Sequence, residues 1–232
     1  MKRVLLKLSG EALANGKNSI YDSEFVDKVA ATLKQAIDEG FQLALVVGAG
    51  NIWRGRQGDD MDRTDADRMG MLATVINAIC LKDALRRVGV GATVMTAVPM
   101  APFATPFSRE AAEAALSSGE VVIFGAGLGI PFLSTDTTGA VRAAEIGADA
   151  MFMAKNVDYI YTDDPRKNPD AKKLEKVKAS EVLAMNLKAI DSTATAFCMS
   201  GGMPIHVFGL REPEDILCAL RGESVGTVIT AE

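Results

Sequence analysis

Short apolar runs rich in branched residues recur along this chain and alternate with longer segments that have helical periodicity. Such alternation is typical of βαβ units, in which helices cover both faces of a parallel sheet. The expected strands span residues 4–8, 42–47, 92–96, 120–124, 150–154, 205–208 and 227–230. The expected helices span residues 23–39, 64–88, 108–118, 180–186, 192–199 and 212–220, and residues 159–179 read as an exposed loop or small hairpin. We therefore predict an α/β fold, a three-layer αβα sandwich around a mostly parallel, open sheet.

The length and composition favour one domain that spans residues 1–232. Of the 232 residues, 48% are hydrophobic and 24% are charged, which is enough to build a large core. The 25 Lys and Arg residues are outnumbered by 30 Asp and Glu residues. A net charge of −5 argues against binding to the phosphate backbone of nucleic acids. We expect a small-molecule partner instead.

Nothing in the sequence predicts export or insertion into a membrane. Lys7 interrupts the apolar run near the N-terminus, and no later segment approaches the roughly 18 uninterrupted apolar residues of a membrane span. The three cysteines, Cys80, Cys198 and Cys218, lie far apart in expected helices without C-x-x-C spacing. This pattern indicates reduced thiols rather than a metal site or disulfides. We expect a cytoplasmic protein with no membrane partner.

Glycine-containing turns follow three of the expected strands, at residues 7–11, 48–55 and 125–131. In an open α/β sheet, ligands bind at the carboxyl ends of strands, where glycine lets backbone N–H groups approach phosphate oxygens. One glycine turn alone could simply close a strand-to-helix connection. Three such turns at one edge of the sheet favour a site for a polyphosphate ligand.

Two familiar phosphate-binding motifs do not fit these turns. The segment 10–17 ends in Gly-Lys but is one residue too long for a P-loop, and Asn18 replaces the required Ser or Thr. The other two turns begin G-x-G, but Trp53 and Ile130 stand where the third glycine of a dinucleotide fingerprint belongs. A bound nucleotide would therefore be held by a different architecture.

Five stretches of the chain form a recognisable series. They read Lys-Leu-Ser-Gly-Glu-Ala-Leu at 7–13, Gly-Asn-Ile-Trp-Arg-Gly at 50–55, Asp-x-x-Gly-Met-Leu-Ala-Thr at 67–74, Pro-Phe-Leu-Ser-Thr-Asp-Thr-Thr at 131–138 and Val-Asp-Tyr-Ile-Tyr-Thr-Asp-Asp-Pro at 157–165. In this order they resemble segments of the bacterial uridylate (UMP) kinases, which belong to the amino acid kinase fold family. The resemblance covers essentially the whole chain.

The resemblance implies an amino acid kinase-like fold and transfer of the γ-phosphoryl group of ATP to UMP, giving UDP and ADP in pyrimidine nucleotide biosynthesis. It implies that the N-terminal half binds UMP and the C-terminal half binds ATP. Mg²⁺ would be carried mainly on the ATP phosphates, with no metal ligands from the protein. Relatives form homohexamers that GTP activates and UTP inhibits. The expected helices 23–39 and 64–88 are our candidates for subunit contacts.

The resemblance also assigns roles to residues at matching motif positions. The expected catalytic residues are Lys7, Arg54, Asp136 and Asp191. The expected ATP-binding residues are Lys7, Leu8, Ser9, Gly10, Gly50, Arg54, Lys155, Tyr161 and Asp164. The expected UMP-binding residues are Ala49, Asp67, Leu128, Gly129, Ile130, Pro131, Phe132, Leu133, Ser134 and Thr135.

Several of these residues also have simpler structural explanations. Lys7 could extend from its strand to solvent, Asp136 could cap a helix, and Asp67 could be a first-turn helix acid. His206, the single histidine, lies in a strand-like segment that favours a packed imidazole over a catalytic one. Trp53 fits either a subunit contact or a shield over the site.

The chain departs from the family pattern at three places. Ala49 stands where relatives commonly have glycine, and Leu128 and Ile130 replace Thr and Asn. The junction at 155–157 is one residue shorter than in some relatives, which leaves the alignment of Lys155 open by one position. Two alternatives therefore stay open: a related kinase of acetylglutamate or carbamate, and a nucleotide-sensing regulator without turnover.

Overall fold

The computed structural model describes residues 2–53, 60–165, 167–187 and 189–232. Within these ranges the strands form one nine-stranded sheet and a separate two-stranded hairpin. In spatial order the large sheet consists of β4 (Thr105–Pro106), β3 (Ala92–Thr96), β5 (Val121–Gly125), β2 (Phe41–Val47), β1 (Lys2–Leu8), β6 (Ala150–Lys155), β10 (Ile205–Gly209), β11 (Thr227–Thr230) and β9 (Lys176–Lys178). Neighbouring strands run parallel except β10 and β11. The predicted mostly parallel sheet is confirmed.

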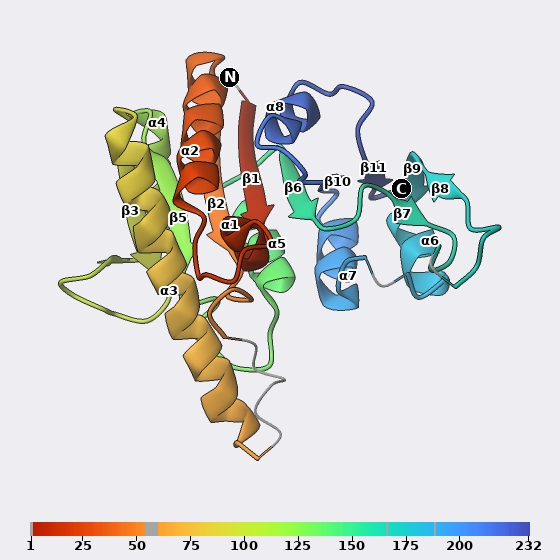
Figure 1. Ribbon diagram of the computed structural model, residues 1–232, viewed down its shortest axis with the longest axis horizontal. Helices are drawn as coiled ribbons and strands as arrows, with labels where there is room; N and C mark the ends of the chain where they lie inside the picture. Colours follow the sequence, from red (N-terminus) through yellow and green to blue (C-terminus); the bar gives the residue numbers. More distant parts are fainter. Residues whose placement is uncertain (1, 54–59, 166, 188) are drawn as a thin grey trace.

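Helices cover both faces of this sheet (Figure 1). One face carries α1 (Gly10–Ala14), α2 (Ser23–Asp38), α3 (Arg63–Arg87) and α8 (Asp215–Leu220). The other face carries α4 (Arg109–Ser117), α5 (Thr135–Glu145), α6 (Ala179–Ala184) and α7 (Ser192–Ser200). The two cores lie between these helical layers and the sheet, so the three-layer αβα sandwich is confirmed.

Side chains of the central strand β1 alternate between the two cores. Leu6 and Leu8 belong to the core on the side of α2, α3 and α8, whereas Leu5 belongs to the core on the side of α5 and α7. Successive side chains of a strand point to opposite faces, so Lys7 shares the face of Leu5. The carboxyl end of β1 therefore directs a lysine toward α5.

Short polar side chains begin two of the major helices. The side chain of Asp62 accepts a hydrogen bond from the Thr64 backbone N–H at 2.9 Å and starts α3. Ser134 caps α5 by accepting bonds from the backbone N–H groups of Asp136 and Thr137. The structural explanation of Asp136 as a helix cap was wrong, because Ser134 has that position and Asp136 lies in the first turn.

Several elements were not expected from the sequence because they lack a strong apolar pattern. They are α1, β4 and β9. Helix α5 was expected only as a helix that begins near Asp136, without bounds. Helix α5 packs closely on the sheet through small residues, and a Cβ on Gly139 would lie 3.2 Å from Leu5 Cδ2. The expected small hairpin within 159–179 is confirmed by the pairing of β7 (Ile160–Tyr161) with β8 (Lys173–Leu174).

The three cysteines lie in helices α3, α7 and α8, as the sequence predicts. Cys198 is buried, Cys80 and Cys218 are partly buried, and all three are free thiols. Burial raises the pKa of the Cys198 thiol to about 12, so this group is inert at neutral pH.

In the part of the chain that the structure describes, no helix combines the length and apolarity needed to cross a bilayer.

Candidate active site

Two lysines and one aspartate meet at the carboxyl ends of the central strands. Lys7 lies near the end of β1, Lys155 ends the neighbouring β6, and Asp136 lies in the first turn of α5. Lys7 Nζ is 2.9 Å from Asp136 Oδ1, and Lys155 Nζ is 2.7 Å from Asp136 Oδ2. Side-chain exposure is only 9% for Lys7, 11% for Asp136 and 18% for Lys155. One carboxylate therefore bridges two largely buried ammonium groups.

Burial and charge act in opposite directions on the pKa of Asp136. Burial raises it, but the charges of Lys7 and Lys155 and their hydrogen bonds outweigh burial and hold the pKa below its ordinary value. The pKa of Lys155 is lowered, first by burial and then by the charge of Lys7. Two cations and one anion leave this cluster with a positive charge, which favours binding of an anion such as a phosphate.

The N-terminus of α5 is tied to that of α7. Ser134 Oγ, which accepts from the Asp136 and Thr137 backbones, donates a hydrogen bond to the Asp191 carboxylate. Asp191 also accepts from Thr137 Oγ1 at 2.9 Å and caps α7 through the Ala194 backbone N–H at 2.9 Å. Asp191 therefore joins two helix N-termini beside the charged cluster.

The first two glycine turns pack against each other. The Gly48 backbone N–H donates to the Leu8 carbonyl at 2.9 Å. A Cβ on Gly10 would lie 2.6 Å from Asn51 Oδ1 and would also meet the Gly48 carbonyl, so only glycine fits at that position. A Cβ on Gly48 would lie 3.7 Å from Thr135 Oγ1. The two turns and the start of α5 thus form one compact unit.

A pocket of about 160 Å³ opens between the second and third glycine turns. It is lined by Ala49, Trp53, Asp67, Gly70, Met71, Thr74, Gly127, Ile130, Pro131, Leu133, Thr135 and Thr138. Six of these lining residues are among the expected UMP-binding residues: Ala49, Asp67, Ile130, Pro131, Leu133 and Thr135. Four other expected residues belong to the same loop but are not part of the wall: Leu128, Gly129, Phe132 and Ser134.

Asp67 attaches the acceptor loop, residues 126–135, to α3. The Phe132 backbone N–H donates to Asp67 Oδ2 at 2.8 Å, and Arg63 Nε contacts both oxygens of the same carboxylate at 2.9 Å. Besides two glycines, two loop residues with side chains have left-handed backbone conformations that such residues rarely adopt: Ala126 (φ 61°) and Phe132 (φ 71°). The first-turn helix acid of α3 is Asp65, so Asp67 does not have that role.

The structure shows the contacts of Trp53 and His206, for each of which the sequence allowed two interpretations. Trp53 Nε1 donates to the Ala66 carbonyl at 2.9 Å, and the Trp53 side chain forms part of the wall of the 160 Å³ pocket. The His206 ring stacks on Phe152 with 4.6 Å between ring centroids, and burial lowers its pKa. His206 is therefore a packed imidazole at a distance from the charged cluster, in the middle of β10.

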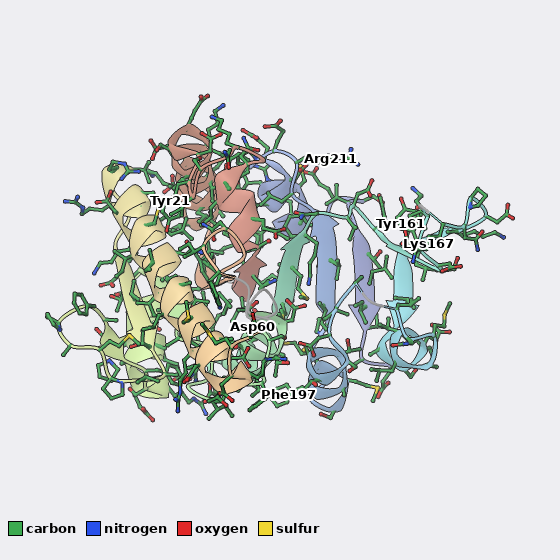
Figure 2. All side chains as sticks on the ribbon, turned by 60° about the horizontal axis from the view of Figure 1, so that its bottom comes forward. Tyr21, Asp60, Tyr161, Lys167, Phe197 and Arg211 are labelled. Atoms are coloured by element: carbon green, nitrogen blue, oxygen red, sulfur yellow. The ribbon has the colours of Figure 1, made fainter. Side chains whose placement is uncertain are left out.

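The expected ATP-binding residues do not all gather in one cavity. Gly50 lines a larger cleft of about 770 Å³, together with Asn51 and Asn156. Tyr161 lies on the β7–β8 hairpin, which projects beyond the main sheet (Figures 1 and 2), and Asp164 follows in the loop of that hairpin. Neither Tyr161 nor Asp164 lines the cleft.

The remaining expected ATP-binding residues lie at or beyond the end of β1. The Leu8 side chain is buried in the core, so only the backbone of Leu8 is available to a nucleotide. Ser9 precedes α1, and its hydroxyl does not cap that helix. Arg54, expected in both the catalytic and the ATP-binding sets, lies outside the described residues.

Two residues of α3 that contact the site were not assigned roles from the sequence. Thr74 Oγ1 accepts a bond from the Ala126 backbone N–H at 2.9 Å and donates to the Met71 carbonyl at 2.6 Å. Asn77 Nδ2 donates to the Gly48 carbonyl at 2.7 Å. Both side chains are polar yet lie on the apolar, inward face of the helix. Because buried polar side chains need hydrogen-bond partners, polar residues on this apolar face were the sequence signal for such contacts.

Comparison with known proteins decides the family. A family model described as the amino acid kinase family matches residues 2–209. The chain belongs to this family. Its solved relatives include UMP kinase from Bacillus anthracis, which is 36% identical with a TM-score of 0.95, over 100% of this chain and 96% of the other.

Two further relatives support the same placement within the amino acid kinase family. UMP kinase from Ureaplasma parvum is 33% identical with a TM-score of 0.93, over 99% of this chain and 98% of the other. Uridylate kinase from Archaeoglobus fulgidus is 30% identical with a TM-score of 0.76, over 99% and 100%. The amino acid kinase-like fold expected from the sequence is therefore confirmed.

We expect Asp136→Asn to destabilise the protein at neutral pH, because it leaves two buried ammonium groups without their shared carboxylate. Removing one partner of a buried ion pair costs about 3–5 kcal/mol. The pKa of Lys155, already lowered by burial, falls further without the carboxylate. Lys155 then releases its proton as pH rises, so the loss of stability is smaller at about pH 9 than at about pH 7. Urea unfolding at both pH values measures this difference.

The wild type should lose stability at acidic pH. The folded pKa of Asp136 is depressed, so its contribution to stability is present above the ordinary carboxyl pKa and is lost as pH falls through the folded value. Asp83→Asn is the matched control, because Asp83 pairs with Arg86 and Arg87 at the exposed end of α3. An Asp136→Asn variant as stable as this control at pH 7 would contradict the role of the cluster.

Proposed function

We propose that this protein is a UMP kinase, which transfers the γ-phosphoryl group of ATP to UMP and releases UDP and ADP. The observation that carries the proposal is the full-length similarity to two bacterial UMP kinases at 33% and 36% identity. The 160 Å³ pocket supports it, because residues expected to bind UMP form half of its wall. The enzyme would act in pyrimidine nucleotide biosynthesis in the cytoplasm.

The proposed chemistry relies on charge neutralisation and alignment. In phosphoryl transfer the charge on the three transferred oxygens must be stabilised while the two nucleotides are held in line. Lys7 and Lys155 would supply positive charge from adjacent strands, and Asp136 would hold both ammonium groups in place. No general base is required, because the second pKa of a phosphomonoester is about 6 and the UMP phosphate is largely deprotonated at neutral pH.

The remaining site residues would bind and orient the two nucleotides. The acceptor would occupy the pocket between Ala49 and the acceptor loop, with Asp67 holding that loop on α3. The γ-phosphate would lie near Ser9 and Gly10, where backbone N–H groups can approach it closely. Asp191 would act by fixing the N-terminus of α5, and Arg54 would provide a further cation. The resemblance assigns UMP to the N-terminal half of one domain, 1–232, and ATP to its C-terminal half, and in this arrangement each half would also contribute residues to the other nucleotide.

Mg²⁺ would be held mainly by the phosphates of ATP. Both oxygens of Asp136 contact ammonium groups, and the Asp191 carboxylate contacts two hydroxyls and a backbone N–H. These carboxylates are therefore engaged by donors rather than directed at an open cation site. When bound, Mg²⁺ would neutralise phosphate charge that the lysines alone do not balance.

The decisive experiment tests the acceptor directly. The purified protein is incubated with Mg·ATP and separately with UMP, CMP, dUMP, acetylglutamate or carbamate, and both ADP and the phosphorylated product are measured. UDP formed from UMP is the expected result. Turnover with acetylglutamate or carbamate would agree with the amino acid kinase-like fold but would contradict UMP as the substrate. Tight nucleotide binding without ADP would favour a sensor, the alternative that the changes at Ala49, Leu128 and Ile130 keep open.

Lys7→Ala should lower turnover by far more than it weakens UMP binding. The ammonium group is proposed to act on charge that develops in the transition state, and removing such a group lowers kcat by about 100-fold or more. Steady-state kinetics with UMP, together with calorimetric UMP binding, separate the two effects. Equal losses in kcat and in UMP affinity would count against a transition-state role for Lys7.

We further propose that the protein forms a homohexamer that uses α3 in a subunit contact. Four large apolar side chains on α3 are 39–53% exposed and follow helical spacing: Met69, Leu72, Ile76 and Ile79. We call them the α3 stripe. The outer face of α2, the other candidate, carries exposed ion pairs such as Lys28 with Glu24. Activation by GTP and inhibition by UTP stay predictions from the family resemblance.

Ile76→Lys should reduce the oligomeric mass, because a charge in the middle of an apolar contact must be desolvated when the contact forms. Sedimentation velocity at several concentrations measures the mass. Met185→Lys is the control, since Met185 is 47% exposed on a different part of the molecule and should leave the mass unchanged. A wild-type protein that is monomeric, or an Ile76→Lys variant with the wild-type mass, would contradict the proposed contact.

A further inference from the structure

The turn after β2, residues 48–51, separates the two hollows of the proposed active site. Ala49 lines the 160 Å³ pocket, whereas Gly50 and Asn51 line the 770 Å³ cleft. On its inner side the same turn packs against Gly10, with no room for a side chain. A shift of this turn would therefore change the pocket, the cleft and the first glycine turn together.

One buried side chain holds this turn from α3. Asn77 has no exposed surface, and its Nδ2 donates to the Gly48 carbonyl at 2.7 Å and to Asn51 Oδ1 at 2.8 Å. Its Oδ1 accepts from the Tyr21 hydroxyl at 2.8 Å and from Asn51 Nδ2 at 3.2 Å. A carboxamide has two donor hydrogens and two acceptor lone pairs, so the hydrogen-bonding capacity of Asn77 is fully used.

The partners of Asn77 come from two other segments of the chain. Tyr21, labelled in Figure 2, lies in the connection between α1 and α2, and Asn51 Nδ2 also donates to the Ile20 carbonyl at 2.9 Å. Burial, with a smaller contribution from Cys80, raises the pKa of Tyr21 to about 12, so its hydroxyl remains a donor at neutral pH. The network therefore joins α3, the 48–51 turn and the segment that begins α2.

The bond to Gly48 has an effect that packing alone would not have. The Gly48 carbonyl lies inside the protein, where a carbonyl without a partner is unfavourable. Asn77 satisfies it and at the same time fixes the direction of the peptide plane. The Ala49 N–H belongs to the same planar peptide unit and points opposite to the Gly48 carbonyl, so its direction is fixed as well.

We propose that Asn77 is a positioning residue for phosphoryl transfer, which acts by fixing the orientation of the 48–51 turn between the two nucleotides. This inference rests on the proposed function, because it assumes that the acceptor and the donor meet at this turn. Misplacement of reacting groups by about 1 Å can lower a rate by about 100-fold. Loss of Asn77 should therefore act on kcat more than on the binding of either nucleotide.

The test compares two Asn77 variants with a control on the same helix. In Asn77→Ala, and in Asn77→Asp at about pH 8, kcat should fall by about 10-fold to 100-fold while KM for UMP changes by less than about 3-fold. Leu81→Ala, one turn further along α3 and also fully buried, should lower the thermal midpoint with kcat nearly unchanged. Variants at Asn77 that lose stability but keep the wild-type kcat would overturn the proposal.

The aspartate variant also gives a signature that a purely structural role would not produce. A buried carboxyl group has a raised pKa, and its protonated form can again donate to the Gly48 carbonyl. The kcat of Asn77→Asp relative to wild type should therefore rise as the pH is lowered from about 8 to about 6. The ratio cancels the titration of UMP itself. A ratio that does not change with pH would contradict the role of this hydrogen bond.

A milder variant covers the case in which the Asn77 variants do not fold. Tyr21→Phe removes only the outer bond to Asn77 Oδ1, and kcat should fall by about 2-fold to 5-fold. A Tyr21→Phe variant with the wild-type kcat would then overturn the proposal. Wild-type turnover is measured first, so that a failure of the proposed function can be told apart from a failure of the inference about Asn77. Absence of UDP from the wild type would overturn the proposed function and this inference with it, whereas an active wild type confines a negative result to Asn77.

Discussion

The salt bridge that Asp136 makes with Lys7 and Lys155 is the interaction on which the arrangement of the site depends. Two ammonium groups this close would repel each other in a buried place, and neither could remain charged at low cost. The negative charge of the carboxylate offsets this repulsion, and the three side chains together keep a net positive charge. The three residues come from β1, β6 and α5, so the fold must bring these elements together before the cluster can exist.

The parallel sheet is what makes this meeting possible. In parallel strands the carboxyl ends lie at the same edge, and β1 and β6 are direct neighbours in the centre of the sheet. Helix α5 connects to β6 and packs under β1 through small residues, so its N-terminus lies at that edge as well. The first two glycine turns follow β1 and β2 at the same edge. The charged cluster, the 160 Å³ pocket and the glycine turns therefore lie at the same edge of the sheet, because the carboxyl ends of parallel strands meet there.

Much of this fold could be predicted from the sequence, because strong apolar patterns carry it. The strands of the sheet centre and the long helix α3 were expected within one or two residues of their observed bounds. The pattern was too weak to give bounds for α5, whose inward face is built from Gly, Ala and Thr, and too weak to predict β4, a strand of two residues. Local preference also misled at Asp136, since a first-turn acid looks like a cap until the partners of its carboxylate are known.

Residues of the candidate site could be predicted where a motif, or the alternation of side chains along a strand, determines their position. Lys155 has the same parity as Met151 and Met153, which face the α5 layer, so it reaches Asp136 although the alignment of its motif was open. Asn77 could not be recognised in this way. Its partners lie 29, 26 and 56 positions away in the sequence, and only the folded chain brings them together. Arg54 lies outside the described residues, so its expected role stays a prediction.

Helix α3 contributes residues both to the candidate site and to the α3 stripe, so one rigid element connects the two. Its 25 residues make a rod about 38 Å long. Asp67 and Thr74 both hold the acceptor loop, and Asn77 holds the 48–51 turn. Ile76 and Ile79, on the same helix, are exposed. In an assembly that packs this stripe against a neighbour, a small rotation of the rod would change subunit contact and nucleotide geometry in one movement. Communication between subunits would then need no separate pathway through the protein, because the subunit contact and the turns that α3 holds would move together.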